Sequence, residues 1–127
     1  MIYGFDYWKV LSHHKRELKP LISALISQGH QVHIISAAGI NRAETTPEAI
    51  KKLDLPKEVN IHMVFWQGHN HQDAPKLKLE KAKELNIDLF FDDRADTCKY
   101  FAENGIPAFQ APFYKYFENN NYVQSKI

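Results

Sequence analysis

The sequence has a single cysteine, Cys98, among its 127 residues. One thiol excludes an internal disulfide framework and any zinc site built from several cysteines, and it is typical of a reducing compartment. Long hydrophobic runs are missing too, and the first residues lack the basic leader that opens a signal peptide. We therefore expect a soluble, cytoplasmic protein without a membrane partner.

An excess of charge of one sign is also missing. The 16 basic and 15 acidic residues give a net charge of +1, and no basic run indicates a nucleic-acid partner. The sequence contains no glycine-rich phosphate loop, no internal repeat and no linker. A chain of this length and average composition predicts one domain. We expect a core at residues 1–112 and an aromatic tail at 113–127 that packs on the core or on a partner, which leaves a homodimer open.

Short apolar runs alternate with segments whose apolar residues have helical spacing. The runs predict strands at 2–5, 32–35, 59–66, 87–91 and 107–109. The spaced segments predict helices at about 18–28, 46–53, 75–85 and 96–104. This alternation predicts a three-layer α/β/α sandwich around a Rossmann-like parallel sheet of about five strands.

Polar residues follow three of these strands: Asp6, Ser36 and the pair Asp92-Asp93. Ligands of open parallel sheets bind beyond the carboxyl ends of the strands. Carboxylate oxygens suit Mg²⁺, while hydroxyl and ammonium groups suit a phosphate. The helix before the fourth strand supplies the ammonium group from Lys76 or Lys78, and we favour Lys78 for its distance from Asp92 in the sequence. The alternative is a purely structural role, in which the acidic pair caps the next helix.

In this order the residues resemble the motifs of the haloacid dehalogenase (HAD) phosphatase superfamily. Gly4 to Leu11 is similar to its first motif, Ile34 to Ser36 to the second, Lys78 or Lys76 to the third, and Leu89 to Arg94 to the fourth. The similarity spans roughly residues 2 to 110 and leaves no room for a cap domain. It implies a HAD-like, capless fold that acts on phosphate esters with Mg²⁺.

The resemblance implies a role for each matching residue. Asp6 is the nucleophile that forms an aspartyl-phosphate, and it also binds Mg²⁺. Asp92, Asp93 and the backbone carbonyl of Trp8 complete the metal ligands. The implied activity is a Mg²⁺-dependent phosphoester hydrolase or phosphotransferase with a phosphorylated substrate of unknown identity.

The same resemblance implies the phosphate contacts. Ser36 binds a phosphate oxygen, and Lys78 offsets negative charge as the transition state forms. The residues that follow the nucleophile and the serine, Tyr7, Trp8 and Ala37, border the phosphate as well.

The first motif departs from the family at two positions. Trp8 replaces the aspartate that acts as general acid, and an indole cannot exchange a proton at neutral pH. Loss of a general acid lowers the catalytic rate roughly 10²- to 10⁴-fold. Lys9 replaces a glycine at a sharp turn. A catalytically inactive relative that binds metal, phosphate or a protein partner is therefore the alternative hypothesis.

Two other alignments remain open. Placing Gly4 at the nucleophile position makes Asp6 the general acid but misplaces the following Val10 and Leu11. A receiver-like phosphorylation switch uses similar residues, but its acidic pair follows the first strand, whereas here it follows the fourth.

Two histidines, His69 and His71, lie in the loop after the third predicted strand. Together with Asp73 they offer ligands for a transition metal. Because this loop lies on the expected site face, we favour contact with the substrate.

Overall fold

The computed structural model describes residues 1–43 and 45–112. Its strands are β1 (Ile2–Phe5), β2 (Gln31–Gly39), β3 (Asn60–Trp66), β4 (Leu89–Asp92) and β5 (Ala108–Gln110). Its longer helices are α1 (Ser12–Ser27), α2 (Thr45–Lys51), α3 (Ala74–Glu84) and α4 (Ala95–Glu103). Single turns occur at η1 (Tyr7–Leu11), η2 (Ile40–Arg42) and η3 (His71–Asp73). None of the helices in the described part of the chain is long and apolar enough to span a membrane.

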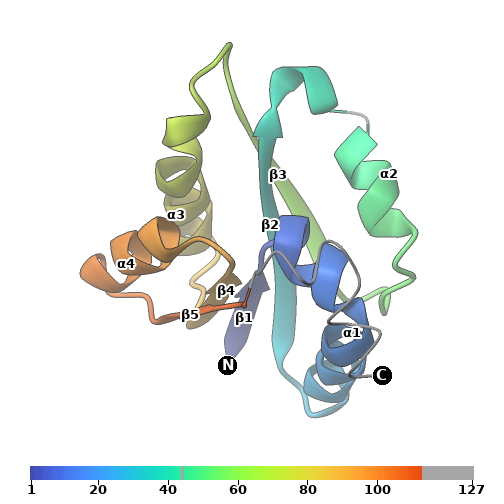
Figure 1. Cartoon of the computed structure of the whole chain (residues 1–127). Coiled ribbons are helices and arrows are strands. Elements are labelled where there is room, and N and C mark those ends of the chain that lie inside the picture. The colour runs from blue at the N-terminus through green and yellow to red at the C-terminus, as the bar shows by residue number, and fades with distance from the viewer. Residues whose placement is uncertain (44, 113–127) are drawn as a thin grey trace.

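The five strands form one parallel sheet in the order β3-β2-β1-β4-β5. Helices α1 and α2 lie on one face and α3 and α4 on the other (Figure 1). Each face buries its own hydrophobic cluster, as expected for a sheet covered on both sides. Phe5 and Ile34 belong to the cluster on the α1–α2 side, and Ile35 and Phe90 to that on the α3–α4 side. The predicted fold class is confirmed.

The sequence underestimated β2 and α1. The small residues from Ser36 to Gly39 read as a turn, but they continue β2, because each pairs with a residue of β3 from Met63 to Trp66. Pairing across the sheet here outweighs the weak strand preference of alanine and glycine. Helix α1 begins at Ser12, before the apolar spacing that predicted it.

Strands β2 and β3 extend past the end of β1. The pairing of β1 with β2 ends at Phe5 and Ile34, whereas β2 continues to Gly39. Figure 1 shows the two long strands rising above β1 and β4. We call residues 35–39 and 62–66 the β2–β3 extension. It forms a wall beside the position where the chain leaves β1.

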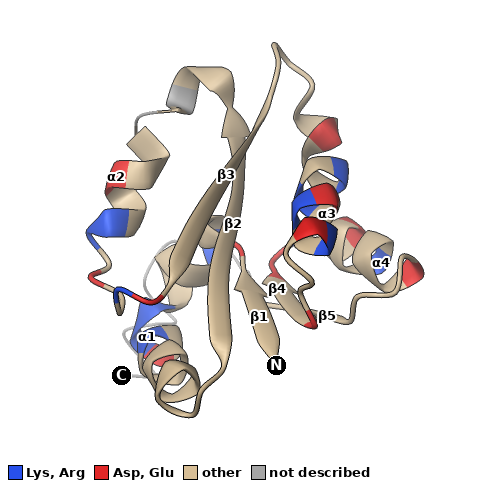
Figure 2. Cartoon of the chain, turned by 180° about the vertical axis from the view of Figure 1, so that it is seen from behind, with Lys and Arg blue, Asp and Glu red and all other residues tan. Residues whose placement is uncertain are grey.

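The strand order reverses between β1 and β4, since β2 and β3 lie to one side of this pair and β5 to the other. Such a switch point opens a crevice at the carboxyl ends of the strands. The switch point therefore positions Asp6, which follows β1, beside Asp92, the last residue of β4. Elsewhere, charged residues are concentrated on the helices (Figure 2).

Candidate functional site

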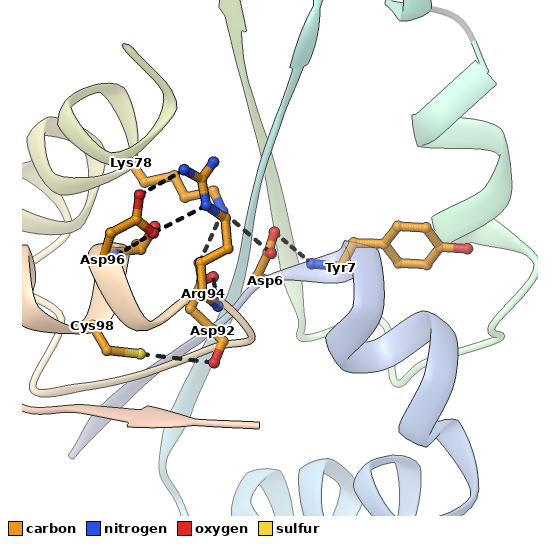
Figure 3. Close-up of polar contacts among 8 residues, drawn as sticks. Asp6, Tyr7, Lys78, Asp92, Arg94, Asp96 and Cys98 are labelled. Atoms are coloured by element: carbon orange, nitrogen blue, oxygen red, sulfur yellow. Dashed lines mark hydrogen bonds and ion pairs between the residues drawn. The ribbon is translucent and has the colours of Figure 1, made fainter. Parts of the chain in front are cut away.

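Lys78 links the ends of β1 and β4. Its Nζ lies 2.8 Å from Oδ2 of Asp92 and 3.2 Å from Oδ2 of Asp6, and Figure 3 shows it reaching from α3 to both carboxylates. The three side chains are almost fully buried. Lys76, the other candidate, is exposed. The geometry therefore selects Lys78.

Backbone groups hold the two carboxylates in place. The Asp6 N–H donates to the Phe91 carbonyl at 2.9 Å, and Oδ1 of Asp6 accepts from the Tyr7 N–H at 2.9 Å. Oδ1 of Asp92 accepts from the Arg94 N–H at 3.0 Å. Fixed acceptors of this kind need little reorganisation when a ligand binds.

Asp93 joins the site as a third carboxylate. Ligand oxygens of Asp6, Asp92 and Asp93 all lie within 4.8 Å of one another. Three convergent carboxylates form the hard-oxygen donor set that Mg²⁺ prefers. The residues present therefore fit a divalent cation.

Burial and mutual repulsion shape the charges of the cluster. Burial raises the pKa of Asp6 to about 7; Lys78 opposes this rise, and Asp92 adds to it. Burial and the Asp92 charge also raise the pKa of Asp93. For Lys78, burial disfavours the charged form, but Asp6 and Asp92 outweigh it and raise the pKa. One ammonium group thus faces three carboxyl groups, an imbalance that a cation relieves.

The backbone turns sharply just after Asp6. Trp8 is extended, with φ −65° and ψ 127°, and Lys9 is left-handed, with φ 62° and ψ 3°. The Lys9 N–H donates to Oγ of Ser12 at 2.8 Å. Position 9, where the resemblance noted in the sequence implies a glycine, is therefore a strained turn, which here carries a side chain.

A cavity of about 310 Å³, the site cavity, adjoins the cluster. The residues lining it are Asp6, Trp8, Lys9, Ala37, Trp66, Ala74, Lys78, Asp93 and Arg94. Arg94 was missed as a site residue; its guanidinium pairs with Asp96 at 2.6 Å, and its place directly after the acidic pair was the signal. Trp66 also lines this cavity, and no sequence signal marked its position here.

Ser36 is not brought into this cavity. It lies fully buried in β2, and its hydroxyl has no hydrogen-bond partner among the described residues. Side chains alternate along a strand, so Ser36 faces the α1–α2 side with Ile34, whereas Ala37 faces the α3 side with Ile35. Ala37 lines the cavity, whereas Ser36 is not among the residues that line it.

The Tyr7 side chain also points away from the site cavity. Only its backbone N–H contacts Asp6, while its ring packs in the α1–α2 cluster (Figure 3). Gly4 lies inside β1, where an added Cβ would sit 2.6 Å from Cδ1 of Phe90. Gly4 therefore faces the core, whereas the side chain of Asp6 faces Lys78.

The remaining sequence candidates lie outside the acidic cluster. His69 and His71 are exposed and line a second cavity with Trp8 and Trp66. Within residues 1–43 and 45–112, the aspartate trio is the one metal-ligand cluster found. Burial raises the pKa of Cys98 to about 11, so its thiol stays protonated at neutral pH. The tail at 113–127 lies outside the described residues, and its packing stays a prediction.

A further cavity, of about 720 Å³, lies between α1 and α2, away from the acidic cluster. It is lined by Tyr7, by parts of both helices and by three lysines, of which Lys15 and Lys52 are exposed. Exposed lysines fix no ligand geometry, so size alone does not make this the functional site.

The fold and the site define an open α/β, Rossmann-like protein with an acidic, lysine-bridged cluster at the sheet edge. No family model matches the sequence, and a search of the curated proteins finds no match. Among solved structures, a chain of the Pnkp1/Rnl/Hen1 RNA repair complex is similar over 90% of this chain, with a TM-score of 0.66 and 15% identity. This chain spans 43% of the length of that one.

A second solved structure has similar architecture. The C-terminal domain of a hydrogenase from Pyrococcus furiosus matches 87% of this chain and 89% of its own, with a TM-score of 0.50 and 17% identity. At such identities the likeness extends to the fold alone.

Proposed function

We propose that this chain is a HAD-like, Mg²⁺-dependent phosphoester hydrolase or phosphotransferase that acts through an aspartyl-phosphate on Asp6. The observation that carries the proposal is the position of Lys78, which lies within 3.2 Å of Asp6 and 2.8 Å of Asp92. An ammonium group beside a strand-end carboxylate and a second acidic pair is the arrangement that the HAD resemblance implies. The proposal treats Asp6 as a nucleophile rather than as a structural acid.

In this proposal the ionised Asp6 attacks the phosphorus atom, and the bond to the leaving oxygen breaks. Lys78 stabilises the negative charge that collects on the nucleophile and the phosphoryl oxygens. Asp6, Asp92 and Asp93 would hold Mg²⁺, which would supply further positive charge there. Water then attacks the aspartyl-phosphate and releases phosphate, and a phosphotransferase would use another acceptor at this step.

The test is phosphate release from a broad panel of phosphomonoesters in the presence of Mg²⁺. Asp6→Asn keeps the shape of the side chain but removes the nucleophilic charge, so we expect release to fall to background. Asp54→Asn, at an exposed turn, is the matched control and should leave the rate unchanged. Equal rates for wild type and Asp6→Asn would sink the proposal.

Trp8 supports a second candidate, a protein that keeps the pocket for recognition and has lost turnover. Trp8 stands where the family's general acid stands, and its indole cannot act as one. Calorimetric binding of Mg²⁺ or inorganic phosphate without release from any ester would support this second candidate. Turnover in the Trp8→Asp variant alone would show that the remaining machinery is intact.

A further inference from the structure

A second cavity, the tryptophan cavity, opens beside the site cavity. Its volume is about 510 Å³, within the range of small-ligand pockets. It shares Trp8, Lys9, Ala37 and Trp66 with the site cavity. A substrate group bound there is therefore contiguous with Asp6 and Lys78.

Small residues on the β2–β3 extension leave this space open. Gly39 has φ −67°, a value that any residue adopts, so its backbone does not require glycine. An added Cβ, however, would lie 2.8 Å from Oδ1 of Asn41 and 3.2 Å from Nε1 of Trp66. Ala37 and Ala38 continue the same lining. The small residues of β2 thus leave space beside the indole of Trp66.

The walls of the tryptophan cavity are aromatic and its remaining lining is polar. Trp8 and Trp66 are both half-buried, which leaves part of each indole available for stacking. Exposed Asn41, His69 and His71 supply hydrogen-bonding groups. Such a lining suits a flat ring that carries polar substituents.

The chemistry at position 8 restricts the leaving group independently. Without a general acid, the oxygen that leaves phosphorus must depart as an anion. A phenol, with a pKa of about 10, supports that charge far better than an alkyl alcohol does. The missing acid and the aromatic cavity therefore favour the same kind of substrate.

We propose that the preferred substrate is an aryl phosphate monoester whose ring lies against Trp8 and Trp66. This inference rests on the proposed function. The Asp6 oxygen forms a bond to phosphorus while the P–O(aryl) bond breaks, and its electron pair leaves with the phenolate, which takes a proton from water. Water then forms the new P–O bond, the P–O(Asp6) bond breaks, its electron pair returns to the carboxylate and the proton of the attacking water passes to solvent.

The test compares kcat/KM for phenyl phosphate, ring-substituted phenyl phosphates and cyclohexyl phosphate, with Mg²⁺ present. We expect phenyl phosphate to exceed cyclohexyl phosphate at least about 10²-fold, the lower range of a general-acid contribution. Rates should rise steeply as the leaving phenol becomes more acidic. A phosphotyrosyl peptide distinguishes the source: a higher kcat/KM than phenyl phosphate indicates a protein substrate, and a lower one a small molecule.

Two tryptophan variants separate stacking from chemistry. Trp66→Ala should raise KM for phenyl phosphate roughly 2- to 10-fold, the range of an aromatic pair, with kcat little changed, and Trp66→Phe should recover most of the loss. Trp8→Asp should flatten the dependence on leaving-group pKa and raise turnover of cyclohexyl phosphate. Phe109→Ala, an exposed aromatic of β5, is the control and should change neither.

The outcomes distinguish the two proposals. No Asp6-dependent release from either class of ester would overturn the proposed function and this inference with it. Asp6-dependent release of both classes at similar rates, or no effect of Trp66→Ala on KM, would overturn this inference alone.

Discussion

At the scale of single residues, Lys78 is the group on which the cluster depends. Its ammonium group is buried between two carboxylates, whose charges nothing else in the described ion pairs offsets. Removing one partner of a buried ion pair leaves an uncompensated charge, which costs more than the intact pair contributed.

Lys78→Met should therefore lower the free energy of unfolding by about 3–5 kcal/mol in Mg²⁺-free buffer, measured by urea denaturation. Lys76→Met removes the same charge from an exposed position of the same helix and should stay within about 0.5 kcal/mol of wild type. A Lys78→Met midpoint that equals that of the control would show that the ion pairs do not hold the cluster.

Gly4 is the second residue where a small change meets a fixed neighbour. It lies in the centre of the sheet against Phe90, which is fully buried. Gly4→Ala should cost about 1–3 kcal/mol of stability through overpacking, measured by the same urea titration. Adding Phe90→Leu should recover part of that loss, whereas additive losses would argue against the contact.

At the scale of elements, β2 and β3 are joined by a histidine pair. Nδ1 of His33 and Nε2 of His62 lie 3.0 Å apart. Burial lowers the pKa of both rings, and for His62 the His33 and Lys81 charges lower it further while Glu84 opposes this effect. Neutral rings are therefore part of the folded structure.

The histidine pair makes the free energy of unfolding depend on pH. The unfolded chain takes up protons near pH 6.5, before the folded rings do, so this contribution to stability is complete above pH 6.5 and is lost as pH falls toward the folded pKa values. Urea titrations between pH 7.5 and 5 should show wild type losing more stability than His62→Asn. The comparison cancels the opposite trend from Asp6 and Asp93, which both proteins share. Parallel pH profiles would refute a contribution from the pair.

At the scale of the whole molecule, metal binding and folding should be coupled through pH. Mg²⁺ stabilises the folded state when it binds there alone. If Asp6 is a ligand, as we propose, Mg²⁺ must also displace the proton that Asp6, with a pKa raised to about 7, holds in mildly acidic solution.

We therefore expect Mg²⁺ to bind about tenfold more weakly at pH 6 than at pH 8, with a correspondingly smaller rise in melting temperature. Calorimetric titration at the two pH values measures the difference. Asp93→Asn removes one of the proposed ligands and should weaken binding at both pH values. An affinity that is independent of pH would mean that Asp6 is not a ligand.

Residues of the site differ in how far the sequence could predict them. Asp6, Asp92 and Asp93 were accessible because parallel strand ends share one edge, and Lys78 because its helix precedes the acidic pair. The location of Ser36 inside β2 was not predicted, because a run of small residues hid the continuation of the strand and with it the face on which the hydroxyl lies. Arg94 follows the acidic pair directly, a signal that the sequence did carry. Trp66 depends on how far β2 and β3 extend in space, which a single sequence does not encode locally.

The unequal strand lengths have a consequence for how the protein can change. The β2–β3 extension contributes Ala37, Gly39 and Trp66 to the tryptophan cavity. These three residues belong to neither hydrophobic cluster. The residues that we propose to contact the substrate are thus largely separate from those that form the two hydrophobic clusters. We therefore expect substitutions in the β2–β3 extension to change substrate selectivity with little effect on the stability of the sheet.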